Sequence, residues 1–184
     1  MCMHNPRAST KGFTLIELLV VIAIIGLLSS IVLASLNTAR GKSKDAVVQS
    51  DLGTVRTQAE LHRKGSPGCY PGVAGAGVCA LTAQTITTFV SGTCAPGASN
   101  NAFCTQPVIQ KALSAAQTAS GGLISFQTPV GAAAYAVVVQ LTTDKALAWC
   151  VDSLGTAKRE GTVGGTALTQ TTLNALIVNN STCL

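Results

Sequence analysis

The sequence has 184 residues, enough for one compact domain with an accessory element and too few for two ordinary domains. Charged residues make up only 10% of the chain and the formal net charge is +5, whereas about a quarter of the residues are charged in ordinary soluble proteins. Beyond residue 64 there are four basic and three acidic side chains, a net charge of +1, which excludes the strongly basic surface typical of nucleic-acid binding.

An apolar block lies near the N-terminus. Residues 18–39 form a run of 22 residues without a charged side chain, LLVVIAIIGLLSSIVLASLNTA. As a helix this run is about 33 Å long, enough to cross the ~30 Å hydrocarbon core of a bilayer. A secretory signal peptide has a shorter apolar core of about 7–15 residues and a small-residue cleavage site after it. This run is longer and no such site follows, so we expect a retained membrane helix.

Flanking charge alone leaves the orientation of this helix nearly tied. Arg7 and Lys11 precede the run, and three basic residues follow it closely, Arg40, Lys42 and Lys44. The cysteines favour one orientation, because six of them lie on the C-terminal side and disulfides form in oxidising compartments. We therefore expect the N-terminus to start in the cytoplasm and the C-terminal part to be exported.

The helix is predicted to continue beyond the apolar run. Apolar residues recur there at spacings of four, three and four, which forms a single stripe on an otherwise polar helix. Gly65 and Pro67 supply the stop signal, so the predicted helix covers residues 13–64. The stripe consists of Val48, Leu52, Val55 and Ala59.

Seven cysteines are present, and Cys2 is the only one before the apolar run. If the N-terminal segment with Cys2 is removed, an even number of six cysteines remains. These six contain no C-x-x-C pair, so they indicate a disulfide framework rather than a zinc site. Two ten-residue spacings favour local pairs, which leaves the last two cysteines for each other. The favoured arrangement, one of the fifteen that six cysteines allow, is Cys69–Cys79, Cys94–Cys104 and Cys150–Cys183.

The residues just before and inside the apolar run form a dense motif, KGFTLIELLVVIAIIG, over residues 11–26. It resembles the N-terminal segment of type IV pilins and of the pseudopilins of type II secretion. The resemblance implies that a prepilin peptidase cuts between Gly12 and Phe13 on the cytoplasmic side, with Lys11 as the basic residue of the site. It also implies N-methylation of the new Phe13 amine. Gly12 suits such a cut because it has no side chain to obstruct the enzyme.

Glu17 is a carboxylate within the apolar segment, where an unpaired charge costs at least a few kcal/mol. After cleavage, the Phe13 amine would be a positive charge four residues away. In a filament of parallel helices, Glu17 of one subunit can pair with the Phe13 amine of its neighbour and set the axial register. The alternative is a glutamate that reaches the headgroup region from a helix end. Gly26 resembles the mid-helix glycine of the family, whereas Ala34 stands where many pilins have a proline.

The expected fold is α+β, with the long helix packed on a small antiparallel sheet and disulfide-stapled loops. We divide the chain into a leader (1–12), the long helix (13–64, membrane-spanning over about 14–39) and an exported head (65–184). The head is expected to be loop-like from Pro67 to about Gln106. Beyond that, we predict a helix at Val108–Ala119 and strands at Leu123–Gln127, Ala134–Thr142, Leu147–Asp152 and Ala157–Glu160.

The sequence offers little for catalysis, and we predict no enzymatic activity, cofactor or metal. Its seven carboxylates are scattered, and it has no paired-carboxylate, HExxH, GxSxG or P-loop motif. Asp144 and Asp152 alone do not supply the six to eight oxygens of a calcium site. We expect Trp149 and Tyr135 to be core or sheet-face residues rather than a binding platform.

The predicted function is a structural subunit of a type IV pilus-like filament. The first alternative is a pseudopilin of type II secretion, and a further one is a membrane-anchored binding domain or hydrolase. The resemblance implies partners of four kinds: identical or related subunits, the prepilin peptidase, an inner-membrane assembly platform, and membrane lipid before assembly. No specific nucleic acid is expected. The subunit would lie in the cytoplasmic membrane as a single-pass protein and then in a cell-surface filament.

Overall fold

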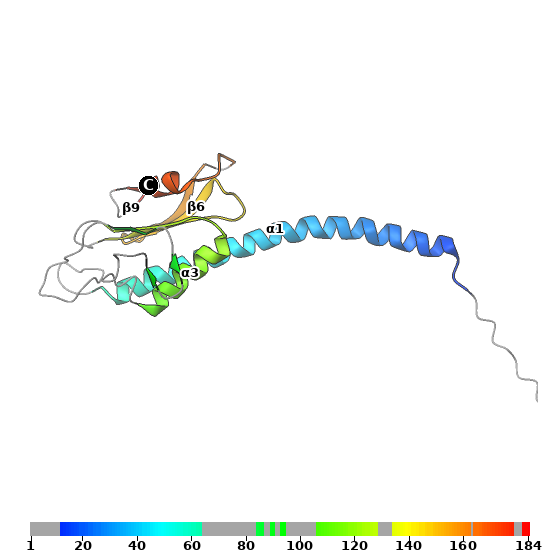
Figure 1. Cartoon of the computed structure of the whole chain (residues 1–184), viewed down its shortest axis with the longest axis horizontal. Helices are drawn as coiled ribbons and strands as arrows, with labels where there is room; N and C mark the ends of the chain where they lie inside the picture. The colour runs from blue at the N-terminus through cyan, green and yellow to red at the C-terminus, as the bar shows by residue number, and fades with distance from the viewer. Residues whose placement is uncertain are drawn as a thin grey trace, which may run out of the picture. The chain divides into compact units, whose positions relative to one another are not determined.

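The computed structural model describes residues 12–63, 84–86, 89–90, 93–94, 106–128, 134–162, 164–178 and 182–184. The chain forms two compact units, Met1–Ala39 and Arg40–Leu184. Figure 1 labels the helices and strands.

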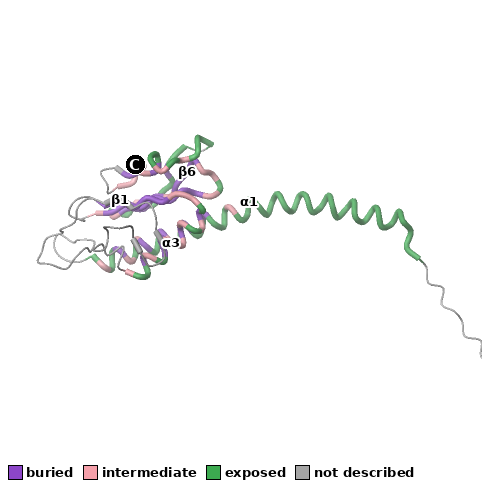
Figure 2. The backbone as a smooth tube through the Cα atoms, viewed as in Figure 1, coloured by how far each residue is buried: buried purple, intermediate pink, exposed green. Residues whose placement is uncertain are grey.

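The long N-terminal helix predicted for residues 13–64 is present as α1, Leu15–Leu61. In the N-terminal unit, every described side chain is exposed, including the large apolar ones, as the green part of the tube in Figure 2 shows. Apolar residues lie all round the helix here, so no single face could be buried against a protein core. By length and composition α1 is able to cross a membrane.

In the second unit, the C-terminal half of α1 buries one stripe, because its apolar residues recur every three to four positions. The four apolar stripe residues predicted from the sequence are all buried. A charged residue, Asp45, is buried with them. Helix α3, Pro107–Ser120, contributes Ile109 and Leu113 to the same core. It ends in Gly121, whose φ of 56° is the left-handed conformation that closes a helix.

Five antiparallel strands form the sheet, in the order β1-β4-β5-β6-β7. The four strands predicted in the C-terminal part are present within two residues of their predicted ends. They are β4 (Ile124–Thr128), β5 (Ala136–Gln140), β6 (Leu147–Asp152) and β7 (Ala157–Gly161).

The prediction of loop from Pro67 to about Gln106 is wrong at three short strands. β1, Gln84–Ile86, pairs with β4 and forms an edge of the sheet, while β2 (Phe89–Val90) and β3 (Thr93–Cys94) form a separate antiparallel pair. Strands of two or three residues are too short for a hydrophobic period to identify them. The remaining residues of this predicted loop, apart from Gln106, lie outside the described residues.

Both faces of the sheet are covered. Along β5, Val137 and Val139 point into the core formed with α1 and α3, while Ala136 and Val138 point into a second apolar cluster with Leu173. Figures 1 and 2 show α3 on one side of the sheet and the C-terminal segment on the other, with buried strands between them. The expected aromatic positions are confirmed: Tyr135 is buried in the first core, and Trp149 packs against it.

The C-terminal segment, for which no element was predicted, supplies this second layer. It contains α4 (Gln170–Ala175), β8 (Ile177–Val178) and β9 (Thr182–Cys183). Two buried glutamines of the sheet hold it: Gln140 Nε2 donates to the carbonyl oxygen of Leu168 (3.2 Å), and Gln127 Nε2 donates to that of Asn174 (3.0 Å). These side chains satisfy main-chain oxygens that would otherwise lose water on burial.

Candidate functional site in the N-terminal helix

Thr14 and Glu17 form a capping box at the start of α1. The Thr14 main-chain N–H and hydroxyl donate to Glu17 Oε2 at 3.0 and 2.8 Å, and the Glu17 N–H donates to Thr14 Oγ1 at 3.2 Å. This reciprocal pattern satisfies main-chain donors that have no partner within the helix. Thr14 is not among the site residues predicted from the sequence, although the spacing Thr-x-x-Glu is the signature of such a box.

Within the subunit, therefore, the described partner of the Glu17 carboxylate is Thr14. Both residues are exposed, as is Phe13 immediately before them, of which 87% is accessible. The charge of Glu17 is not neutralised by these neutral donors. Any positively charged partner for it would have to come from outside the described part of the chain.

The two glycines expected to matter are unconstrained in the monomer. A side chain placed at Gly12 or at Gly26 would meet no atom within 4 Å. Among the described residues, no contact therefore requires glycine at these two positions. Lys11, the basic residue of the predicted processing site, lies outside the described residues.

Farther along α1, Asp45 connects the helix to the sheet. Its Oδ1 accepts the Thr142 N–H at 2.6 Å, and its Oδ2 accepts the Thr143 N–H at 3.3 Å together with the Thr143 hydroxyl. Only 7% of Asp45 is exposed. Three donors to one buried carboxylate offset its loss of hydration. Asp45 thus fixes the position of α1 against the turn between β5 and β6, a role that the sequence analysis missed.

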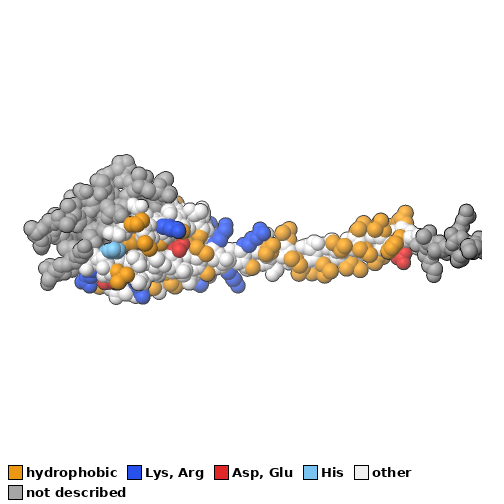
Figure 3. Space-filling view, turned by 90° about the horizontal axis from the view of Figure 1, so that it is seen from below, with side chains coloured by type: hydrophobic (Ala, Val, Ile, Leu, Met, Phe, Trp, Pro, Cys, Tyr) orange, Lys and Arg blue, Asp and Glu red, His pale blue; other side chains and the backbone are white. Residues whose placement is uncertain are grey.

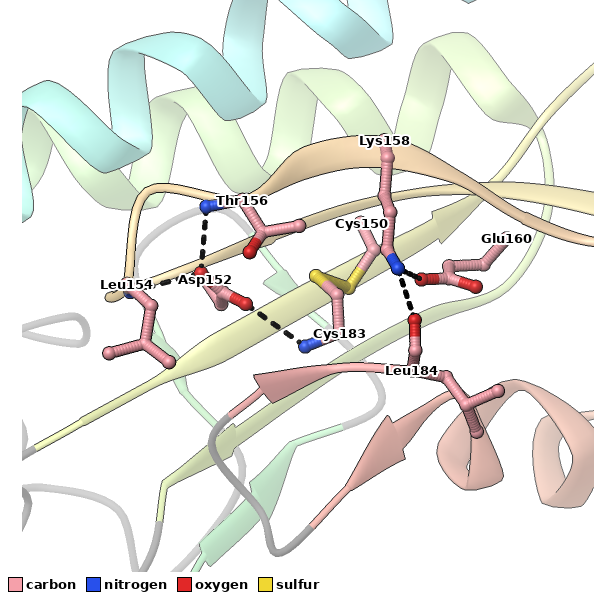
Figure 4. Close-up of a disulfide and its surroundings, with 8 residues drawn as sticks. All are labelled: Cys150, Asp152, Leu154, Thr156, Lys158, Glu160, Cys183 and Leu184. Atoms are coloured by element: carbon pink, nitrogen blue, oxygen red, sulfur yellow. Dashed lines mark hydrogen bonds and ion pairs between the residues drawn. A yellow bond between two sulfur atoms is a disulfide. The ribbon is translucent and has the colours of Figure 1, made fainter.

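A second group of contacts holds the C-terminal strand on the sheet (Figure 4). A disulfide joins Cys150 of β6 to Cys183 of β9, the pairing favoured from the sequence. Beside it, Asp152 Oδ2 accepts the Cys183 N–H at 3.1 Å, and Lys158 Nζ donates to the main-chain oxygen of Leu184. Of the other two predicted pairs, Cys69, Cys79, Cys104 and the side chain of Cys94 lie outside the described residues.

Asp152 also shapes the turn that follows β6. Its Oδ1 accepts the main-chain N–H groups of Leu154 and Thr156, both at 2.9 Å. With 1% of its surface exposed, Asp152 has both carboxylate oxygens occupied by main-chain donors. Asp144 is used in a similar way: it accepts the N–H groups of Ala146 and Gly164, and these bonds hold the pKa of its carboxyl below the ordinary value. Asp152 and Asp144 therefore both stabilise turns of the head by accepting main-chain N–H groups.

In the part of the chain that the structure describes, no three His, Cys, Asp or Glu side chains lie close enough together to hold a metal ion. The chemically distinctive part of the described chain is accordingly the start of α1. It combines an exposed apolar helix, one carboxylate near its first turn and a glycine–phenylalanine junction before it.

Comparison with known proteins matches this same segment. Residues 7–33 match the family model of the prokaryotic N-terminal methylation motif. The type IV wide pilus major component PilA4 of Thermus thermophilus is 42% identical over 55 residues, which cover 30% of this chain and 42% of that protein. A type IV major fimbrial protein FimA of Dichelobacter nodosus is 38% identical over 69 residues, 36% of this chain and 44% of that protein. No solved structure gives a significant match.

The segment defines a class of protein, that of chains with a prokaryotic N-terminal methylation motif. The motif and the relatives thus show a similarity to type IV pilins over the N-terminal part of the chain. The chain spans less than half the length of the curated relatives it matches.

Proposed function

We propose that this chain is a non-enzymatic structural subunit of a type IV pilus-like filament. The observation that carries the proposal is the start of α1, an exposed apolar helix with a single carboxylate near its first turn, within the segment that matches the methylation motif. An apolar surface of this length needs either lipid or other helices around it. A subunit that first lies in a membrane and then packs into a filament core gives it both.

We further propose that residues 1–12 are a cytoplasmic leader, that a prepilin peptidase cuts after Gly12, and that the Phe13 amine is then methylated. The long helix, residues 13–64, anchors the subunit as a single-pass protein over about residues 14–39. The head, residues 65–184, is exported before an inner-membrane platform assembles the filament on the cell surface. N-terminal mass spectrometry of sheared filaments tests this: a methylated Phe13 supports the proposal, and an intact Met1 contradicts the processing.

When the filament assembles, Glu17 gains a second partner. In the monomer, Thr14 donates to the carboxylate but leaves its charge in place. In the filament, the Phe13 amine of a neighbouring subunit supplies the missing positive charge. Removing one partner of such a buried pair costs roughly 3–5 kcal/mol, and this cost repeats at each subunit contact. Gly26 lies on the same exposed helix, where its small size allows close helix packing.

Two replacements of Glu17 separate its two roles. Glu17→Gln keeps an oxygen for the capping box but removes the charge, whereas Glu17→Ala removes both. We expect both variants to reduce filament yield strongly while the amount of membrane-bound subunit is unchanged, and Glu17→Asp to be intermediate because it keeps the charge on a shorter side chain. Normal filaments from Glu17→Gln would show that capping, not pairing, is the role of this residue.

A pseudopilin of type II secretion would share this N-terminal segment. The C-terminal segment favours the pilin, because some pseudopilins carry an acidic calcium loop near their C-terminus and residues 166–184 contain no Asp or Glu side chain. A deletion strain distinguishes the two functions. Loss of surface filaments with normal protein secretion is expected for a pilin, and loss of secretion without loss of filaments would identify a pseudopilin.

A further inference from the structure

Three basic residues lie close together on α1 where its charged part begins. Arg40, Lys42 and Lys44 are all exposed and follow directly on the uncharged run of residues 18–39. We refer to these three residues as the basic collar. Figure 3 shows the corresponding change along the helix, from a stretch covered with hydrophobic side chains to one that carries basic side chains.

Helix geometry distributes the basic collar around α1. Gly41 lies against Thr143 and Asp45 bonds to the same turn, so both mark the side of the helix that faces the sheet. At about 100° per residue, Arg40 and Lys44 lie on one flank of that contact and Lys42 on the other. The three cations rise about 6 Å along the axis. They therefore lie on the two flanks of the head contact, within one narrow band along the helix axis.

The carboxylates nearest to the basic collar in the sequence and across the turn are already in use. Asp45 accepts donors from Thr142 and Thr143, and Asp144 accepts two main-chain N–H groups. Among the described residues, the salt bridges are Arg63–Glu60 and Lys158–Glu160, neither of which includes a collar residue. Within the described part of the subunit, no salt bridge therefore includes a collar residue, and the three cations together with the neighbouring Asp45 leave a net positive charge at this level of the helix.

The position of the basic collar matches the phosphate level of a bilayer. The preceding run is about 33 Å long as a helix, against a hydrocarbon core of ~30 Å, and each headgroup layer is roughly 5–8 Å thick. A band of cations about 6 Å deep that starts directly after the run falls within that layer. Three cations on the exported side also oppose the usual preference of basic residues for the cytoplasmic side. A favourable contact with anionic groups would offset this cost.

We propose that the basic collar binds the phosphate groups of anionic phospholipids in the outer leaflet of the membrane that holds the subunit before assembly. The inference rests on the proposed membrane anchoring and goes beyond it by assigning a lipid class and a binding site. Because the cations flank the head on both sides, bound lipids hold the head close to the membrane surface. These contacts are released when the subunit leaves the membrane for the filament.

The test uses the full chain reconstituted in phosphatidylcholine bilayers that contain a trace of spin-labelled lipid. The fraction of motionally restricted label gives the relative association of phosphatidylglycerol and phosphatidylcholine with the protein. We expect phosphatidylglycerol to associate roughly fivefold more strongly, because a single basic residue near a charged surface contributes about 1 kcal/mol to the contact with an anionic lipid. The preference should fall at 1 M salt, where the Debye length is about 3 Å.

Two double variants with the same change in net charge locate the effect. Lys42→Gln with Lys44→Gln should abolish most of the preference, whereas Lys111→Gln with Arg159→Gln, which removes two exposed cations of the head, should leave it intact. Trp149 fluorescence verifies that both variants fold. Equal association of the two lipids with the wild type, or an equal loss in both variants, would overturn the proposal. Failure of the chain to enter bilayers of either lipid would instead overturn the membrane anchoring itself.

Discussion

The replacement Asp45→Asn isolates the carboxylate that fastens α1 to the sheet. Asparagine has nearly the same shape, but only one of its two terminal atoms accepts a hydrogen bond. The wild-type carboxylate accepts the N–H groups of Thr142 and Thr143 and the Thr143 hydroxyl. In the variant, an amide NH₂ faces at least one of these donors, and one main-chain N–H group of this partly buried contact loses its partner.

The expected cost follows from these contacts. A hydrogen bond to a charged group contributes about 1.5–3 kcal/mol, and an unsatisfied buried donor costs about 1–3 kcal/mol. Because the Thr143 side chain is exposed and can bond to water instead, we expect a total loss of about 2–3 kcal/mol in the free energy of unfolding of the head. For a domain of this size, that loss lowers Tm by roughly 4–12 °C.

The measurement is urea unfolding of the full chain in detergent micelles, followed by the fluorescence of Trp149, the single tryptophan, which packs against the core of the head. Asp51→Asn is the matched control, since it makes the same chemical change six residues farther along α1. Oδ2 of Asp51 is buried and has no hydrogen-bond partner among the described residues, and desolvation raises the pKa of this carboxyl. Removing its charge should therefore be neutral or stabilising at pH 7.

Two results would refute this reasoning. The first is an Asp45→Asn variant within about 0.5 kcal/mol of the wild type, the ordinary range for surface substitutions. The second is an equal loss of stability in Asp51→Asn, which would show that any carboxylate beside the buried stripe of α1 matters. A change confined to the slope of unfolding with urea would indicate altered compactness rather than a lost contact.

Two further predictions concern the head. The N–H groups of Gly164 and Ala146 lower the pKa of Asp144. Its contribution to the free energy of unfolding is therefore present above the unfolded pKa and is lost as the pH falls through the folded value. When stability is measured at decreasing pH, Asp144→Asn should lose less than the wild type, and equal curves would contradict this assignment. Replacing both Cys150 and Cys183 with serine opens a loop of 33 residues. Chain entropy predicts that the free energy of unfolding then falls by roughly 3–4 kcal/mol. An unchanged urea midpoint would show that the Asp152 contact alone holds the C-terminal strand.

The sequence by itself determined the features that depend on neighbouring residues along the chain. The unbroken apolar run, the motif around Gly12 and Phe13, the helical stripe from Val48 to Ala59 and the strands β4 to β7 can all be read from local periods and spacings. The Thr14–Glu17 box also belongs to this group, because three residues separate its members and the spacing alone identifies it.

Only the tertiary structure decided which side chains meet across long separations. Asp45 and Thr142 are 97 residues apart, and the sequence gives no period that links them. Gln127 and Gln140 are polar residues on strands for which one covered face was predicted, yet both are buried beneath the C-terminal segment. The physical reason is that a polar residue is stable in a core only when a partner satisfies it. That partner is supplied by the fold of the whole chain, not by the neighbours of the residue in sequence.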